Sequence, residues 1–230
     1  SAVQTAYLWL DDTASMDFKS AANVPYSKLD GARVLALALA NLMMRGGESI
    51  GSLDRAVKPG ASKQKAEELA DWLLKPRDQD LPQSGTGRVG IQTRTPTPTP
   101  IPTPTPTPAY AQQVWFSDFL MPMDDLKASL LSQTKNRQRG VLVQIVDPSE
   151  FSLPYTGRTK FTGLEGEADW TVQKTEGVKD LYATRWREHC DNLNLMAKAA
   201  GWSLVQVNTG DVLSKPLTKL FGLLTEGSNK

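Results

Sequence analysis

Short apolar runs alternate with helical stretches along this chain. Four runs have the length and composition of buried strands, at 7–11, 114–117, 141–146 and 203–207, and a shorter one is predicted at 49–53. Apolar residues at helical spacing lie between them, at Lys28–Arg45, from Ser62 to about Lys75, from Asp124 onward, at Val178–Ala200 and at Leu217–Leu224. Strand and helix thus alternate five times. This alternation predicts an α/β fold with three layers, a doubly wound and mostly parallel sheet between helices.

Two stretches depart from this alternation. Residues 151–174 are irregular, with a predicted hairpin between Lys160–Leu164 and Trp170–Gln173. Residues 76–110 are rich in threonine and proline, and 95–108 alternate Thr and Pro almost strictly, which favours an extended polyproline conformation. We expect this stretch to be an insertion that projects from the rim of a single domain spanning 1–230. It is either a spacer or a docking segment for a proline-binding module.

Composition limits the partners and the compartment. The chain has 230 residues and a formal net charge of +1, so no overall field attracts it to nucleic acid or to an anionic membrane. Its longest apolar run, Val34–Met44, is eleven residues and too short to span a bilayer. The single cysteine, Cys190, is typical of a reducing, cytoplasmic protein. Because Ser1 stands almost directly before a core strand, we expect the chain to be a piece of a longer protein.

Oxygen-bearing side chains follow two of the predicted strands. Asp11, Thr13 and Ser15 come directly after the first strand, and Asp118 ends the strand at 113–119. With strand order 3-2-1-4-5-6, these two strands flank the point where the order reverses, which is where such sheets bind ligands. Carboxylate and hydroxyl oxygens suit Mg²⁺ or Mn²⁺. The alternative is that Asp11 and Thr13 only cap a turn.

Other residues and motifs give weaker evidence for a functional site. Asp147 and Glu150 leave a strand on the same edge, either as neighbours of the metal or partner or as turn caps. The glycine pattern at 85–90 lacks the helix that a dinucleotide site needs. The only histidine, His189, is predicted to lie in mid-helix as a packed residue, and one histidine with one cysteine is too few for a zinc site.

Several segments together resemble the von Willebrand factor type A fold. They are LDDTASM, SKLDGARVLALALANLMMRGGESIGSL and VWFSDFL. VQIVDPSEFSLPYTGRTKF and GWSLVQVNT resemble one branch of it, the bacterial domain-of-unknown-function family encoded beside MoxR-type AAA+ ATPases. The resemblance covers nearly the whole chain outside the Thr-Pro stretch.

This resemblance implies a metal-ion-dependent adhesion site. Asp11, Thr13 and Ser15 match its first motif, with Thr13 in place of the commoner serine, and Asp118 matches its last aspartate. The threonine expected between them has Ser62 as its best counterpart by order and Thr86 as a poorer one. In that fold, a partner's carboxylate completes the coordination of the metal.

Two functions therefore stay open. One is a non-catalytic, metal-dependent protein-binding module that works with a MoxR-type ATPase in assembly or chaperone-like maturation of a client. The other is a Mg²⁺-dependent hydrolase of phosphate esters. The sequence favours the first, because it offers two aspartates for a cation but no evident general base or phosphate cradle.

Overall fold

The computed structural model describes seven stretches of the chain, which are residues 4–21, 23–54, 56–75, 107–108, 110–135, 137–161 and 170–226. The predicted Thr/Pro insertion at 76–110, Thr86 within it, and the turn of the predicted hairpin lie almost entirely outside the described residues.

A five-stranded parallel sheet forms the centre of the fold. Its strands are β1 (Thr5–Leu10), β2 (Ser49–Ser52), β3 (Gln112–Ser117), β4 (Arg139–Val146) and β7 (Ser203–Asn208). All four neighbouring pairs run parallel. The predicted α/β class and the parallel sheet are confirmed, with strand ends shifted by one or two residues.

The strand order differs from the expected 3-2-1-4-5-6. It is β2-β1-β3-β4-β7, so the sheet strands taken in chain order run 2-1-3-4-5. Only five runs in the sequence were long and apolar enough for a central sheet, and a six-strand order needs one more. The order still reverses between β1 and β3, so Asp11 and Asp118 keep their predicted place beside the reversal.

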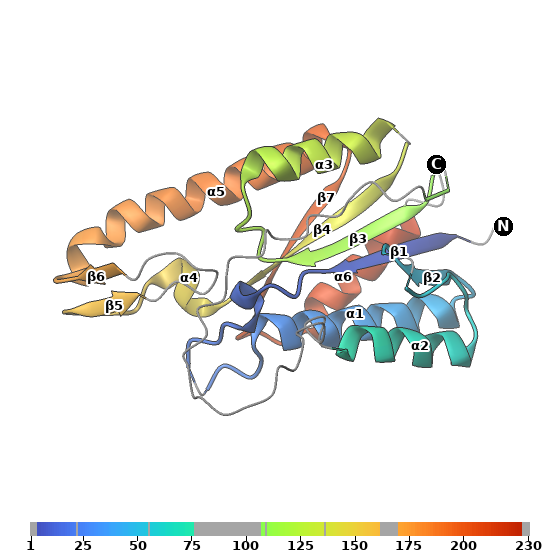
Figure 1. The fold of residues 1–230 in the computed structure, drawn as a ribbon, viewed down its shortest axis with the longest axis horizontal. Helices are drawn as coiled ribbons and strands as arrows, with labels where there is room; N and C mark the ends of the chain where they lie inside the picture. Colours follow the sequence, from blue (N-terminus) through green and yellow to red (C-terminus); the bar gives the residue numbers. More distant parts are fainter. Residues whose placement is uncertain are drawn as a thin grey trace, which may run out of the picture.

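Helices cover both faces of the sheet (Figure 1). On one face lie α1 (Lys28–Arg45), α2 (Lys63–Leu74) and α6 (Ser214–Glu226), with α2 packed on α1. On the other lie α3 (Met123–Lys135) and α5 (Lys179–Ala199). Right-handed crossovers between parallel strands require helices on the sheet faces, which gives the three layers.

The strands alternate their side chains between two cores. Leu8 of β1 and Phe116 of β3 enter the core under α1 and α6, whereas Trp9 and Trp115 enter the core under α3 and α5. Trp115 also meets Trp202 edge to face, with ring centroids 4.9 Å apart. Because both faces are buried, these strands contain short apolar runs, such as 114–116 and 141–143, rather than a strict alternation of apolar and polar residues.

Short elements surround the carboxyl ends of the strands. A 3-10 turn, η1 (Ala14–Asp17), follows β1, and a short helix, α4 (Pro148–Ser152), follows β4. A hairpin of β5 (Thr159–Phe161) and β6 (Trp170–Val172) confirms the predicted pairing, and a second 3-10 turn, η2 (Thr175–Val178), leads into α5. The sequence analysis missed α4, because five residues are too few to show helical periodicity.

None of the helices in the described part of the chain combines the length and the apolar character needed to cross a bilayer.

Candidate functional site

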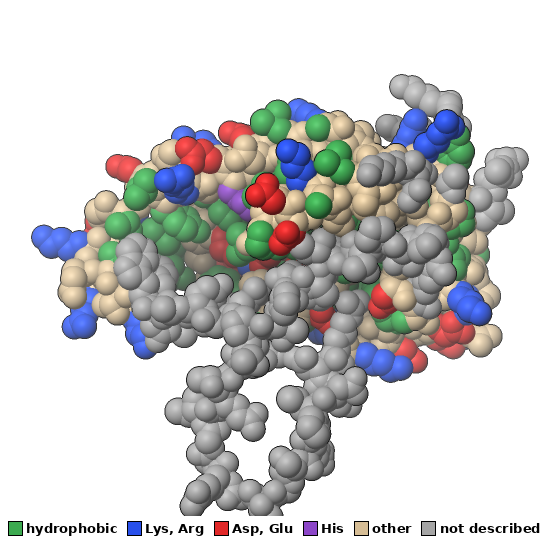
Figure 2. Space-filling model, turned by 45° about the horizontal axis from the view of Figure 1, so that its top comes forward, with side chains coloured by type: hydrophobic (Ala, Val, Ile, Leu, Met, Phe, Trp, Pro, Cys, Tyr) green, Lys and Arg blue, Asp and Glu red, His purple; other side chains and the backbone are tan. Residues whose placement is uncertain are grey.

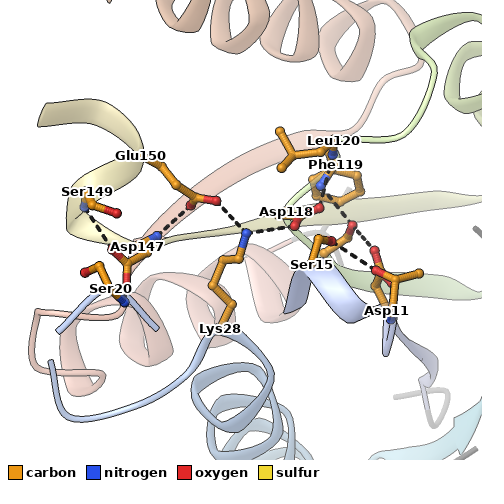
Figure 3. Close-up of polar contacts among 12 residues, drawn as sticks. Asp11, Ser15, Ser20, Lys28, Asp118, Phe119, Leu120, Asp147, Ser149 and Glu150 are labelled. Atoms are coloured by element: carbon orange, nitrogen blue, oxygen red, sulfur yellow. Dashed lines mark hydrogen bonds and ion pairs between the residues drawn. The ribbon is translucent and has the colours of Figure 1, made fainter. Parts of the chain in front are cut away.

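The predicted site residues lie at the carboxyl edge of the sheet, after β1 and β3. Asp11 follows β1 directly, and its backbone N–H donates to the Phe116 carbonyl of β3 at 2.9 Å. Asp118 follows β3 directly, so the two aspartates leave neighbouring strands at nearly the same level. Thr13 and Ser15 lie on the turn after Asp11, with their hydroxyl oxygens 3.1 Å apart. Figure 3 shows Asp11, Ser15 and Asp118 along this edge.

Asp11 is held in a buried position, with only 1% of its surface exposed. One carboxylate oxygen accepts the Thr13 backbone N–H at 3.0 Å, and the other accepts the Ser117 hydroxyl at 2.6 Å. Burial, together with the negative charge of Asp118, raises the pKa of Asp11 to about 6, and these hydrogen bonds only partly offset the rise. Asp11 and Asp118 are therefore close enough to sense each other's charge.

Ser117 is a site residue that the sequence analysis did not single out. It is the last residue of β3 and fully buried, and its hydroxyl also accepts the Phe119 backbone N–H at 2.9 Å. One hydroxyl thus fixes both the Asp11 carboxylate and the turn that carries Asp118. A serine just before the aspartate, at the end of an apolar strand, is the signal that identifies it.

Lys28 is the second residue that the sequence analysis missed, and it is the most unusual one here. It is the first residue of α1, and its side chain is 1% exposed. Its ammonium lies 2.8 Å from Asp118 Oδ2 and 2.5 Å from Glu150 Oε1, as Figure 3 shows. Burial lowers the pKa of Lys28, but the two carboxylates outweigh it and the pKa is raised overall. A lysine at the start of a largely apolar helix was the available signal.

Glu150 and Asp147 tie this ion pair to β4. Asp147 follows β4 and caps α4 by accepting the Ser149 N–H. In turn, a carboxylate oxygen of Glu150 accepts the Asp147 N–H at 2.8 Å, which completes a capping box. Asp147 also accepts the Ser20 N–H at 3.0 Å, which fastens the segment after η1 to the end of β4. The capping alternative is thus confirmed, whereas a role beside a metal or a partner stays a prediction.

Helix α5 passes close to this edge. The Tyr182 hydroxyl donates to the Glu150 carbonyl at 2.5 Å. His189 has its Nε2 buried without a hydrogen-bond partner among the described residues. Burial lowers the pKa of His189, and the charge of Asp118 acts in the opposite direction. No carboxylate accepts a hydrogen bond from its Nε2 among the described residues.

The donor set fits a divalent cation in part. Asp11, Thr13 and Ser15 place one carboxylate and two hydroxyl oxygens on one turn, which suits Mg²⁺. Asp118 is different, because one of its oxygens already faces the Lys28 ammonium and the other accepts the Leu120 N–H at 3.1 Å. Among the described residues, no three or more His, Cys, Asp or Glu side chains are grouped as metal ligands. Metal binding stays a prediction.

Ser62 has another role in the described contacts. It is the N-cap of α2, and its exposed hydroxyl accepts the Lys65 N–H at 3.2 Å. Among the described residues, no hydrogen bond or ion pair joins it to Asp11 or Asp118. Thr86, the other candidate for the missing hydroxyl, lies outside the described residues.

A family model matches part of the chain. The family model described as a protein of unknown function, DUF58, matches residues 103–192. This part of the chain is similar to that uncharacterised bacterial family. The match runs from just before β3 into α5 and includes Asp118, Asp147 and Glu150, whereas Asp11 and Lys28 lie outside it. No curated protein matches the chain.

Proposed function

We propose that this protein is a non-catalytic, metal-ion-dependent protein-binding module that docks its partner at the carboxyl edge of the sheet. The observation that carries the proposal is the charge balance there. Among the described side chains at this edge, Asp118 and Glu150 contact the Lys28 ammonium, whereas Asp11, beside Asp118, accepts hydrogen bonds from Thr13 and Ser117. An excess of buried carboxylate favours a further cation.

Asp11, Thr13 and Ser15 would hold Mg²⁺, or Mn²⁺ in its place. Bound there, the cation would supply a positive charge at the edge and a coordination position for an acidic side chain of the partner. Without it, an approaching Asp or Glu meets carboxylates of its own sign. Recognition of an acidic partner at this edge therefore depends on the divalent cation.

Apolar side chains beside the acidic edge favour a protein as the partner. Leu120, two residues after Asp118, is 50% exposed, and Phe151, directly after Glu150, is 47% exposed. Phe151 also lines a hollow of about 270 Å³ between the ends of β4 and β7. On the face drawn in Figure 2, hydrophobic and acidic side chains lie close together, and neither sign of charge dominates. Apolar contacts around a polar centre are typical of protein interfaces.

The resemblance described above points to the kind of partner. A MoxR-type AAA+ ATPase, or a client that it assembles or matures, is the partner we propose. The match to an uncharacterised bacterial family over 103–192 is compatible with that branch but names no partner. Phosphate-ester hydrolysis has less support, because His189, the only histidine of the chain, has no aligned carboxylate among the described residues.

A pull-down with the purified ATPase tests the proposal. The full chain is the bait, in millimolar Mg²⁺ and in EDTA, beside Asp11→Asn and the control Asp71→Asn. Asp71 is exposed and lies on α2, so its substitution changes the same charge away from the edge. We expect recovery of the partner by wild type and Asp71→Asn in Mg²⁺ only, and none by Asp11→Asn.

Equal recovery in Mg²⁺ and in EDTA would refute the metal dependence. Turnover of a generic phosphomonoester by wild type with Mg²⁺, lost in Asp11→Asn, would favour the hydrolase instead. Both assays use the same three proteins, so the two functions are compared directly.

A further inference from the structure

Lys28 occupies a position that is unfavourable for a lysine in two ways. It follows the N-cap Ser27 as the first residue of α1, where the helix dipole disfavours a positive charge. Its ammonium is also buried, and burying a charge is costly unless it is paired. A lysine at such a place requires strong partners.

The partners come from two other strand ends. Asp118 follows β3 and Glu150 lies on α4 after β4, and each places one carboxylate oxygen against the ammonium. The centroid of the Phe18 ring lies 5.8 Å from Lys28 Nζ, and the backbone N–H of Lys28 donates to the Phe18 carbonyl at 3.2 Å. Lys28 thus joins the first helix to the ends of β3 and β4.

The remaining oxygens of these carboxylates are also engaged. Asp118 accepts the Leu120 N–H with its second oxygen, and Glu150 accepts the Asp147 N–H with its second oxygen. Asp118 is therefore oriented completely by groups of the protein. It does not need a metal ion to hold its position, and its nearest positive charge is internal.

We infer that Lys28 is a positioning residue that acts as a built-in cation of this edge. It pairs with Asp118 and Glu150, and it restricts any divalent cation to Asp11, Thr13 and Ser15. This inference uses the site of the proposed function but concerns how its charge is set. An ammonium beside the site opposes a second cation, so removing it should strengthen Mg²⁺ binding and make the fold depend on that ion.

The chain contains a matched control for this lysine. Lys63 is likewise the first residue of its helix and follows a serine N-cap, but its side chain is 92% exposed. Lys28→Met and Lys63→Met therefore remove the same group from equivalent helix positions, one buried and one in solvent. Methionine keeps an unbranched chain of similar length and removes the ammonium, with its charge and its hydrogen-bond donors.

The experiment measures the urea midpoint and the Mg²⁺ affinity of the full chain, by denaturation and by calorimetry with magnesium chloride. We expect Lys28→Met to lose stability in EDTA, to regain more of it in millimolar Mg²⁺ than wild type does, and to bind Mg²⁺ at least about tenfold more tightly. Lys63→Met should behave as wild type.

Lys28→Met with wild-type affinity for Mg²⁺, or unfolded with and without the ion, would overturn the inference. If it is unfolded in EDTA but folds in Mg²⁺, the inference stands. These measurements contain no partner protein, so their outcome does not depend on the outcome of the pull-down. Metal-independent partner binding would refute the proposed function and leave the role of Lys28 intact.

Discussion

Ser117→Ala gives the sharpest test of how the edge is held together. The substitution removes one buried hydroxyl that donates to Asp11 and accepts the Phe119 N–H. It leaves a buried carboxylate oxygen and a buried backbone donor without these partners. Each such loss costs about 1–3 kcal/mol. Because both groups share one hydroxyl, the two costs do not add in full, and the free energy of unfolding should fall by about 2–4 kcal/mol.

Chemical and thermal unfolding both measure this loss. For a chain of this size, about 2–4 kcal/mol corresponds to a fall in Tm of roughly 4–16 °C. Ser132→Ala is the control, because the Ser132 hydroxyl only donates to the Ser129 carbonyl within α3. Its substitution should change stability by no more than about 0.5 kcal/mol. A Ser117→Ala loss as small as that of the control would refute the reasoning, since Asp11 would then not depend on the hydroxyl.

Three further substitutions test the fold around this edge. Gly140→Ala should cost about 3 kcal/mol or more in urea denaturation, because a Cβ there would lie 2.4 Å from the Gln113 carbonyl oxygen. Leu39→Ala, in the core under α1, should cost about 2–5 kcal/mol in the same assay. Asp147→Ala should cost about 1–2 kcal/mol at pH 7. Burial raises the pKa of Asp147, but the Ser20 and Ser149 donors outweigh it and lower the pKa below 3.8. That stabilisation is present above pH 3.8 and is lost as the pH falls through the folded-state pKa, so wild type and variant should converge there in pH-dependent denaturation.

The sequence was sufficient for the fold because local patterns specify it. Strands buried on both faces contain short apolar runs, such as 114–116 in β3. Apolar residues of the helices between them repeat at helical spacing, as on the buried face of α3. Strand order is a different matter. It depends on which strands pair over long separations, and the extra strand that the expected order needed had no apolar run of its own.

Site residues were predictable where one motif contains them. Asp11, Thr13 and Ser15 share a turn, and Asp118 ends a recognisable strand. Lys28 was missed because its role depends on Asp118 and Glu150, which lie 90 and 122 residues away in the chain. A lysine near a helix start is usually solvated, as Lys63 is, so only the tertiary structure separates the two.

The ion pairs of Lys28 join the part of the chain that matches the family model to the part before it. The matched residues 103–192 supply Asp118 and Glu150, while Asp11 and Lys28 come from the part of the chain before them. Neither part alone contains the ion pairs of this edge. The part before residue 103 has the Lys28 ammonium without its carboxylates, and residues 103–192 have the carboxylates without the ammonium. Since an unpaired buried charge is strongly destabilising, residues 103–192 expressed alone would expose or protonate these carboxylates. The candidate site is therefore a property of β1, η1, α1, β3 and α4 together, and variants that test it belong in the full chain.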